Sequence, residues 1–564
     1  MLLTVPSIKD GGNFRALSYE WGERKKEREV FTESGVLKIW GSLHKAILTL
    51  RGKQNAAVFW IDAICINQID DSEKIQQIRL LPQIFQQASR TIAFLGSDRR
   101  SDDAIETLLQ IRAKLDKSEE WPKELKKVPE SWQHESKPRL EDPIWQDIKV
   151  LFDRTWFRRA WIVQEAVASL TVTFVCGKWI VDWEDIHLAM EIVQQKPHLP
   201  NDITASWAPF STLSSLRELE TRQRRFSLFT LLDKFHYMQS TLKRDHFFAL
   251  LGLASDGDED GFSPRYGSIP FVSIAVQYGE TFVKQGKGAH LLRRAGIAGR
   301  SDTARTRFPS WLPDLTARPR DRLLDLHDRG IIFNASKGVK EDINTSKGVR
   351  GDIFGRDFLE VNGCIFDDII EVSKTSNGQG PKQWVKYFAE IDDMINALHS
   401  ESLPEYRHDL KVQVPIAGAL SLGELSIEDS YTAFRQSLKK ARFKSAKQLN
   451  LRTSRAPISK TSSSIQTGVM TMQEKGRQYE ELLKTNIAGW RFITTKRKHC
   501  GIAPNGVRVG DVISVIGGCD VPFVMRGSRK FMEFRLIAGC YVHGMMKGEA
   551  SKFPDVNETY FLID

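Results

Sequence analysis

Residues 57–64 read AVFWIDAI and residues 70–88 read DDSEKIQQIRLLPQIFQQA, and these two segments decide the expected fold. The first is β-branched and aromatic, which predicts a buried strand. The second opens with Asp70 as a helix cap and Glu73 three residues later, and its apolar residues recur at helical spacing, so it predicts a helix. Pro82 falls inside this pattern and is expected to kink the helix or to start a new turn.

Strand and helix patterns alternate on both sides of this pair. Short apolar runs predict further strands, and apolar residues at three- and four-residue spacing predict further helices. The strands are expected at residues 14–19, 91–95 and 171–176, and the helices at residues 42–50, 157–170 and 182–193. Because strands that alternate with helices are joined by right-handed crossovers, we expect an α/β fold around a mostly parallel sheet.

The composition is that of an ordinary globular protein. The chain has 564 residues, which favours three or four domains, with 41% hydrophobic and 27% charged residues. Its six cysteines form no C-x-x-C pair, so we expect free thiols and no metal. No apolar run approaches the length of a membrane span and the first residues lack a signal-peptide core, so the sequence predicts a cytoplasmic protein.

One segment carries most of the net charge of +10. Residues 430–473 contain nine basic residues and no acidic ones, so the rest of the chain is close to neutral. A solvated flexible linker is the simpler interpretation. An anionic partner, either nucleic acid or a lipid surface, is the alternative. Phe434 and Phe443 offer too few interleaved aromatic rings to favour nucleic acid.

The remaining segments change character along the chain. Helical patterns continue over residues 207–253 and 271–284, and residues 114–142 are polar enough for a surface excursion. SKGVKEDINT at residues 336–345 is repeated at once as SKGVRGDIFG, which we interpret as an inserted loop or hairpin. Strands are expected at residues 358–372 and helices at residues 384–398 and 431–443. Short β runs punctuated by glycine over the last 75 residues or so predict a small antiparallel β unit such as a barrel.

Polar residues gather where the strand predicted at residues 57–64 ends. Asp62 lies at the carboxyl end of that strand, the edge at which open α/β sheets bind ligands. Cys65, Asn67 and Gln68 follow in a loop ahead of the predicted helix, where an anion or a ribose can bind. Asx-type turns that only hold the loop are an equally good interpretation of Asp62 and Asn67. Cys65 is a candidate nucleophile, although an inert thiol is the simpler interpretation.

A second group of candidates lies on the predicted helix 157–170. Arg158, Trp161 and Glu165 share one face of that helix, and Gln164 lies beside it. A tryptophan next to a carboxylate on an apolar helix suits a pocket that stacks a flat ligand and raises a carboxyl pKa. The alternative is a structural pair of Glu165 with Arg158 or Arg159, with Trp161 in the core.

The strand expected at residues 14–19 adds aromatic candidates to these two groups. Tyr19 is its last residue, and Trp21 and Gly22 follow it. These residues can line the same pocket, or the two aromatic rings can simply pack in the core. The familiar phosphate-loop, dinucleotide, zinc-protease and serine-hydrolase motifs are all absent from the sequence. The motifs therefore assign no common enzyme class.

Three long segments resemble one known family. They are ALSYEWG at residues 16–22, FWIDAICINQIDDSEK at residues 59–74 and WFRRAWIVQEA at residues 156–166. Together they resemble the three sequence blocks of the fungal heterokaryon-incompatibility (HET) domain. FFALLGLA at residues 247–254, PSWLPDL at residues 309–315 and the run from residue 491 to 550 resemble the rest of large HET-domain proteins. The Asp-Pro-Arg-Asp of the family is LKRD here, at residues 242–245.

The resemblance implies a domain order. It places an HET domain at residues 1–195, a helical extension at 196–330 and the duplicated loop at 331–357. A mixed region that includes the basic segment follows at 358–489, and a β unit at 490–564. HET domains are remotely similar to TIR domains of innate immunity, which implies a flavodoxin-like, TIR-like parallel sheet with flanking helices.

The resemblance also implies a function in fungal non-self recognition and programmed cell death. Because some TIR domains hydrolyse NAD with a glutamate, Glu165 or Asp62 would be the catalytic carboxylate. NAD would then be a substrate, and Tyr19, Trp21 or Trp161 would stack its base. The alternative is a non-enzymatic HET interaction module, which self-associates or binds another incompatibility protein to trigger death.

Overall fold

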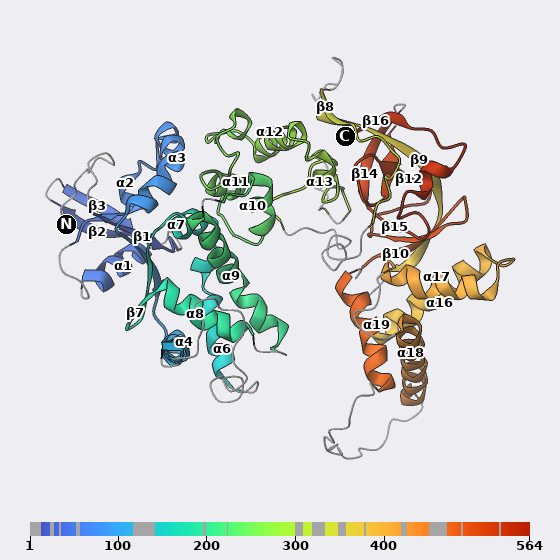
Figure 1. Ribbon diagram of the computed structural model, residues 1–564, viewed down its shortest axis with the longest axis horizontal. Helices are drawn as coiled ribbons and strands as arrows, with labels where there is room; N and C mark the ends of the chain where they lie inside the picture. The colour runs from blue at the N-terminus through green and yellow to red at the C-terminus, as the bar shows by residue number, and fades with distance from the viewer. Residues whose placement is uncertain are drawn as a thin grey trace. The chain divides into compact units, whose positions relative to one another are not determined.

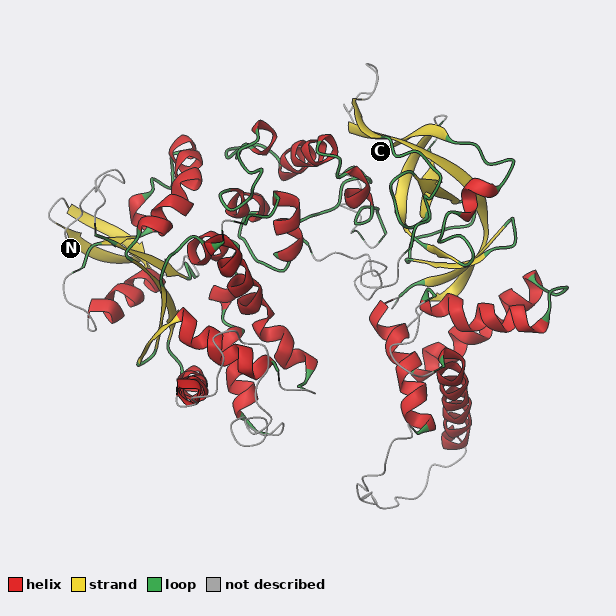
Figure 2. Ribbon diagram, viewed as in Figure 1, coloured by secondary structure: helices red, strands yellow, loops and turns green. Residues whose placement is uncertain are grey.

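The computed structural model of the chain divides into two compact units, which are described separately. The first unit comprises residues 1–274 and 315–318, and the second comprises residues 275–314 and 319–564. The structure describes residues 13–22, 27–32, 35–51, 57–116, 142–195, 199–222, 224–298, 300, 308–317, 333–347, 357–376, 380–418, 426–449, 471–486, 489–528 and 532–564. The surface excursion expected at 114–142 lies almost wholly outside these ranges. Figure 1 labels the elements, and Figure 2 distinguishes helices from strands.

A mostly parallel sheet forms the centre of the first unit. Its strands are β1 (Arg15–Tyr19), β4 (Phe59–Trp60), β5 (Arg90–Gly96), β6 (Val172–Cys176) and β7 (Trp179–Asp182). They lie in the order β4-β1-β5-β6-β7, and only β7 is antiparallel to its neighbour. Numbered within the sheet this order is 2-1-3-4-5, the flavodoxin order. The expected α/β fold is therefore confirmed.

Helices cover both faces of this sheet because buried side chains alternate along its strands. Val175 belongs to a core cluster with Leu43 and Ala46 of one helix. Its neighbour Phe174 points to the other face and packs against Trp183 and Phe210. The helices of the sheet region are α1 (Gly41–Arg51), α3 (Asp71–Gln87), α4 (Arg99–Asp116), α6 (Ile144–Phe152), α7 (Ile162–Val167), α8 (Trp183–Gln194) and α9 (Asn201–Thr221).

The prediction of a strand at residues 57–64 is correct only for Phe59 and Trp60. Only Phe59 and Trp60 pair with β1, as an edge strand, and the chain then turns into the one-turn helix α2 (Asp62–Cys65). The turn is closed by the Cys65 amide, which donates to the Ile61 carbonyl at 2.8 Å. An apolar run this short fits either a strand or a buried helical turn, so periodicity could not separate them.

The single helix expected at residues 157–170 is also wrong. The chain forms the 3-10 helix η2 (Thr155–Arg158), then an extended residue, and only then α7. Arg159 is that extended residue and forms an isolated bridge with Gln239, next to which the Ala160 amide donates to the Gln239 carbonyl at 2.8 Å. A segment far along the chain therefore breaks the helix. Pro82, by contrast, does not end α3.

The first unit extends past the boundary expected at residue 195. The helices α9, α10 (Leu228–Lys234) and α11 (Lys243–Leu251) and the turn η3 (Asp260–Phe262) belong to it. Gly252 after α11 lies so close to Pro82 of α3 that a Cβ there would fall 2.2 Å from the proline ring. The strands β2 (Glu27–Thr32) and β3 (Gly35–Trp40) form a separate hairpin that the sequence analysis did not predict.

A barrel-like sheet forms the centre of the second unit. Its order is β12-β13-β14-β16-β9-β10-β11-β15, and β12 also pairs with β9, which closes a ring. The expected C-terminal β unit is therefore confirmed, although its longest strand, β9, begins already at Asp357, and β14 and β16 run parallel. The strands are β8 (Ile343–Lys347), β9 (Asp357–Ser376), β10 (Arg491–Thr495), β11 (Cys500–Ala503), β12 (Val512–Ile516), β13 (Phe523–Gly527), β14 (Glu533–Gly539), β15 (Tyr541–Val542) and β16 (Thr559–Ile563).

Helices of the second unit include both ends of the basic segment, and the helix expected at residues 431–443 is confirmed. Residues 427–449 form one long helix, α18, which packs beside α19 (Figure 1). Tyr431 and Phe434 are buried, and Arg435 pairs with Asp392 at 2.5 Å. The rest of the segment, residues 450–470, lies outside the described residues. The helices here are α12 (Phe271–Lys284), α13 (Gly288–Leu292), α16 (Pro381–Leu398), α17 (Pro404–Gln413), η4 (Val414–Ile416), α18 (Ile427–Leu449), α19 (Met472–Asn486) and η5 (Glu549–Lys552).

The duplicated segment forms part of the sheet of the second unit. β8 spans the end of the first copy and the start of the second, and it pairs antiparallel with β9. The hairpin interpretation agrees with this pairing for the described residues; residues 348–356 are not described.

Candidate functional site

A cavity of about 650 Å³ opens in the first unit at the carboxyl ends of β1 and β4. This is the side of the sheet at which ligands bind in open α/β folds, next to the strand where the order reverses. The lining comes from the three sequence blocks, from the rest of α3 and from residues 239–266. It consists of Leu17, Tyr19, Trp21, Asp62, Ile66, Gln68, Lys74, Ile78, Leu81, Phe85, Arg159, Trp161, Glu165, Gln239, Ser240, Thr241, Leu242, Asp245 and Tyr266.

Glu165 enters the cavity from α7 and is held by a hydrogen-bond relay. The Trp156 indole N–H donates to the Ser18 hydroxyl at 2.8 Å, and that hydroxyl donates to the Glu165 carboxylate. The residue is only 6% exposed. Burial raises the pKa of Glu165 to about 7, and the Asp62 charge adds to the increase, while Arg159 and the Ser18 hydroxyl oppose it. The carboxyl therefore changes its protonation state near neutral pH.

Asp62 enters the same cavity from the start of α2. Its Oδ2 accepts the Trp21 indole N–H at 3.0 Å, and its Oδ1 accepts the Ala63 amide at 2.7 Å. Burial raises its pKa, while Arg159 and both hydrogen bonds act in the opposite direction. The buried Glu165 and the partly buried Asp62 thus share one cavity, and the Asp62 charge favours the neutral form of Glu165.

Arg159 is the cation that both carboxyls share. Its extended backbone places the guanidinium at the cavity, where it donates to the Tyr19 carbonyl. It lowers the pKa of both Asp62 and Glu165 against the effect of burial. The lining holds three carboxyls, those of Asp62, Glu165 and Asp245, against the two cations Arg159 and Lys74. The fully ionised site therefore carries excess negative charge, which suits a cationic group on a ligand.

Aromatic rings line the cavity around these charges. Tyr19, Trp21 and Trp161 all contribute to the wall. Tyr19 is 1% exposed, its pKa is raised mainly by burial, and its hydroxyl has no hydrogen-bond partner among the described residues. A buried hydroxyl without a partner is unfavourable, and buried polar groups of this kind are normally satisfied. A polar group of a ligand in the cavity would supply the missing hydrogen bond.

Four further residues of the site were missed by the sequence analysis. Arg159 was considered only as a structural partner, and Asp245, Tyr266 and Lys74 were not considered. The Asp245 carboxyl accepts hydrogen bonds from the Tyr266 hydroxyl, at 2.9 Å, and from Trp161, and burial raises its pKa. Lys74 lies over the Tyr266 ring at 4.7 Å. The one sequence indication was the LKRD segment, which keeps the last aspartate of the family pattern.

The structure brings six of the eleven predicted residues together at this cavity. They are Asp62, Glu165, Tyr19, Trp21, Trp161 and Gln68. Gln68 donates through its Nε2 to the Asp62 carbonyl at 3.1 Å, which holds the loop against α2. The lining thus draws on all three sequence blocks.

Five predicted residues do not line the cavity, and two of them flank its loops. Gly22 has a φ of +66° just after Trp21, so it serves the turn, where a side chain would be strained. The Asn67 side-chain Oδ1 accepts a hydrogen bond from the Ile69 backbone amide at 3.2 Å. The Asn67 backbone amide donates to the Glu73 carboxylate at 3.0 Å. This geometry is that of an Asx turn that connects α2 to the Asp70-capped α3.

The other three have separate partners or environments. Arg158 pairs with Asp153 at 2.6 Å, because the break at residue 159 turns it away from Glu165. Gln164 is fully buried and donates to the Phe248 carbonyl at 3.1 Å. The Cys65 thiol is in an exposed residue, yet desolvation raises its pKa and the Asp62 charge adds to this, so its surroundings do not favour a thiolate.

The comparisons with known proteins agree with this architecture. The family model for heterokaryon incompatibility protein (HET) matches residues 14–165, and the model for the Het-6 beta-barrel domain matches residues 356–563. Heterokaryon incompatibility protein 6, OR allele, of Neurospora crassa is 23% identical over 661 aligned positions, which span 100% of this chain and 93% of the relative. No solved structure matches the chain.

The helices were also compared with the requirements of a membrane span. Among the described residues, none of them has both the length and the apolar character that a bilayer crossing needs. The HET match covers β1, β4 and β5 of the first sheet and ends within α7, and the barrel match covers β9 to β16 of the second. The chain is therefore an HET-domain protein whose C-terminal part matches the Het-6 barrel.

Proposed function

We propose that this protein is an effector or signalling component of fungal non-self recognition and cell death, acts in the cytoplasm, and hydrolyses a nucleotide of the NAD type in the cavity of its HET domain. The observation that carries the proposal is the meeting of Asp62, Glu165 and two tryptophans in one cavity at the carboxyl edge of the sheet. Its volume of about 650 Å³ suits a ligand of nucleotide size. The unpartnered Tyr19 hydroxyl adds a buried polar group that faces no protein partner among the described residues.

The charges of the cavity suit the chemistry of this reaction. Hydrolysis of NAD breaks the bond between the ribose and the nicotinamide nitrogen, and water adds to the ribose carbon with release of nicotinamide and one proton. Positive charge develops on the ribose in the transition state, and a carboxylate beside it stabilises that charge. Glu165, in its ionised form, is the proposed stabilising group, and Asp62 the second carboxylate. Trp21 and Trp161 supply flat surfaces on which a base can stack.

The test is NAD turnover by the full chain beside Glu165→Gln and Asp62→Asn. We expect either substitution to reduce turnover by at least about a hundredfold, because electrostatic stabilisation of the transition state is lost. Since the ionised form of Glu165 is required and its pKa is about 7, turnover should rise with pH between 6 and 8. Chromatographic measurement of the released nicotinamide gives both the loss of turnover in the variants and its pH dependence.

Asp153→Asn is the matched control. Asp153 is a partly buried carboxylate of the same unit that pairs with Arg158 and Lys149 and does not line the cavity. Its variant should turn over NAD like the wild type. Absence of NAD turnover in the wild type, with the protein folded by circular dichroism, contradicts the proposal, and so does equal turnover by Glu165→Gln.

A non-enzymatic interaction module is the second candidate, and one surface favours it. Phe31 and Val36 lie opposite each other across the β2–β3 hairpin and are 72% and 54% exposed. Their neighbours Val30 and Leu37 point to the other face and pack against the core. No other strand of the described residues pairs with β2 or β3, so this hairpin with exposed apolar side chains is suited to pair with another chain, either a second copy or another incompatibility protein.

Phe31→Asp distinguishes the two candidates. If the module acts by self-association, this variant should be monomeric at concentrations where the wild type sediments as a larger species, and NAD turnover should be absent from both. If the enzyme candidate holds, Phe31→Asp should retain turnover, because the residue does not line the cavity. Analytical ultracentrifugation and the nicotinamide assay on the same preparations give both answers.

A further inference from the structure

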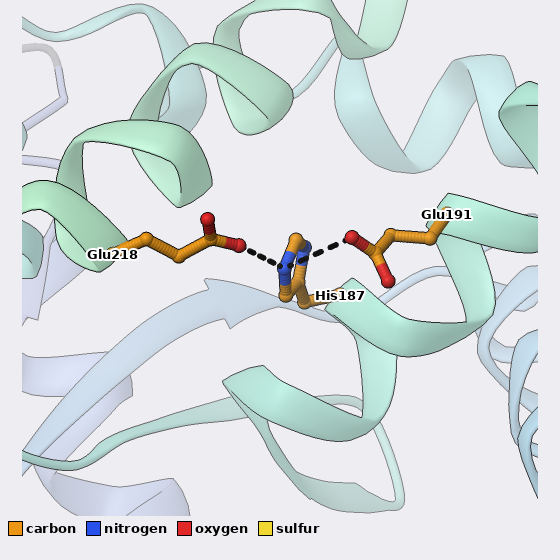
Figure 3. Close-up of side chains that lie close together, drawn as sticks. All are labelled: His187, Glu191 and Glu218. Carbon is orange, nitrogen blue, oxygen red and sulfur yellow. Dashed lines mark hydrogen bonds and ion pairs between the residues drawn. The ribbon is translucent and has the colours of Figure 1, made fainter. Parts of the chain in front are cut away.

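Three potential metal ligands meet between two helices of the first unit, on residues that do not line the cavity described above. His187 and Glu191 lie four residues apart on α8, so they share one face of that helix. Glu218 projects toward them from α9 (Figure 3). The ligand atoms of the three side chains all lie within 4.8 Å of one another. The sequence analysis did not predict this cluster, because one of the three residues comes from a separate helix.

The distances in this cluster suit a bound transition metal. The His187 Nε2 lies 3.2 Å from the Glu218 Oε1 and 3.8 Å from the Glu191 Oε1. Around a tetrahedral zinc ion with bonds of about 2.0–2.1 Å, two ligand atoms stand about 3.3 Å apart. The His187–Glu218 distance already matches this spacing, and the His187–Glu191 distance exceeds it by about 0.5 Å.

The local charges leave this cluster short of a cation. Two other acids of α8 have arginine partners, since Glu184 pairs with Arg217 and Asp185 with Arg112. Among the described residues, Glu191 and Glu218 face only His187, whose Nε2 can donate one hydrogen bond at a time.

One carboxylate oxygen adds an independent observation. The Glu191 Oε2 is buried and has no hydrogen-bond partner among the described residues. A buried carboxylate oxygen without a donor is unfavourable, because its lost hydration is not replaced. A divalent ion bound by the Glu191 carboxylate, whose Oε1 lies nearest His187, would neutralise both glutamates.

We infer that His187, Glu191 and Glu218 form a binding site for a divalent transition-metal ion of the zinc class, which connects α8 to α9. One imidazole nitrogen and two carboxylate oxygens are ligands that zinc accepts, whereas Ca²⁺ and Mg²⁺ prefer oxygen ligands alone. The side chains are 17%, 33% and 54% exposed, so water can reach a fourth position. The ion would stabilise the contact between α8 and α9.

The test is zinc binding to the full chain without an affinity tag, after removal of metals with a chelator. Isothermal titration should show one equivalent of zinc, and His187→Gln and Glu218→Gln should each weaken binding by at least about tenfold, since each removes one of three ligands. At the same zinc concentration, zinc should also raise the thermal unfolding midpoint of the wild type more than that of Glu218→Gln. Because Glu218 is half exposed, its variant is expected to fold.

Two control variants keep the test specific. Glu220→Gln changes the same type of side chain on α9, but Glu220 pairs with Arg225 at 2.8 Å and not with the cluster, so zinc binding should be unchanged. Cys65→Ser removes the exposed thiol, and it should also bind as the wild type. With Co²⁺ as the probe, the absorption spectrum should lack a sulfur-to-metal charge-transfer band.

Three results would overturn the inference. The first is that the wild type takes up no zinc. The second is that His187→Gln and Glu218→Gln bind zinc as tightly as the wild type. The third is that Cys65→Ser loses zinc binding. In each of these cases His187 is only the ion-pair partner of the two glutamates.

Discussion

Buried carboxyls occur in both units of the chain, and the two units treat them in opposite ways. In the barrel, Asp511 accepts two hydrogen bonds from Arg526, at 2.7 and 2.9 Å, and one from the Arg508 amide at 2.7 Å. In the HET domain, Glu165 and Asp62 share one guanidinium, and burial raises the pKa of both.

A second barrel aspartate extends the contrast. Burial tends to raise the pKa of Asp367, but hydrogen bonds from His499, Thr495 and two backbone amides lower it overall. Its charged form is thus stabilised by the fold, whereas that of Glu165 is not. Carboxyls whose ionised form is stabilised by the fold act as structural anchors. Carboxyls whose ionised form is disfavoured, so that their pKa is raised, are typical of functional sites. The contrast teaches that burial alone does not assign a role, and that the partners of the group do.

The barrel side of this contrast gives the largest expected effect. Asp511→Ala leaves the Arg526 guanidinium without its bidentate partner, and we expect a loss of about 3–5 kcal/mol in the free energy of unfolding. The midpoint of urea unfolding measures it. Asp555→Ala is the control, because Asp555 pairs with Arg497 at the surface, where solvent screens the pair. An equal effect of the two substitutions would show that Asp511 is no anchor.

The HET side predicts an effect of the opposite sign. The folded pKa of Glu165, about 7, exceeds its ordinary value of 4.5, so the folded chain keeps a proton that the unfolded chain releases. This contribution to stability is fully present below about pH 4.5 and is lost as the pH rises through about 7. Glu165→Gln, which has no charge to bury, should therefore stabilise the protein by up to about 3 kcal/mol at pH 8 and little at pH 4.5.

Urea unfolding of wild type and Glu165→Gln at both pH values checks this prediction. Asp153→Asn, measured in parallel, should lack the pH-dependent gain. If Glu165→Gln destabilises the protein equally at both pH values, the Glu165 carboxylate is a structural anchor like Asp511, and the contrast fails.

The unpartnered Tyr19 hydroxyl gives the smallest effect. Tyr19→Phe removes a buried polar group that makes no hydrogen bond, so stability should stay the same or rise by about 1 kcal/mol. Binding of ADP-ribose in the cavity should at the same time weaken if the ligand satisfies this hydroxyl. Thermal unfolding and titration calorimetry measure the two changes. A loss of stability well above 1 kcal/mol would mean that the hydroxyl already has a partner within the fold.

Elements with a full periodic pattern were predicted well from the sequence. The expected helix at residues 271–284 has the bounds of α12, and Asp70 caps α3 through the Ser72 and Glu73 amides as expected. Local interactions suffice for these features, since a cap and an amphipathic face are properties of neighbouring residues. Short or interrupted elements were predicted poorly. The strand β7, the β2–β3 hairpin and the turn α2 depend on pairing or on backbone contacts that periodicity does not encode.

The candidate site was predicted in part for the same reason. Asp62 and Glu165 were selected from their own segments, but Asp245 was not, because it reaches the cavity only through the packing of the α10–α11 region. Arg158 and Arg159 exchanged their expected roles when the contact with Gln239 broke the helix.

The sequence by itself determined the types of most elements, the capped helix after the second block and the membership in the HET family. These properties depend on residues that are close together along the chain. Only the tertiary structure decided which carboxyls share a cavity, which cation serves them and how far their pKa values move. Desolvation and Coulomb interactions act through space, so they depend on the order of the strands and on the break at Arg159, which bring distant segments together.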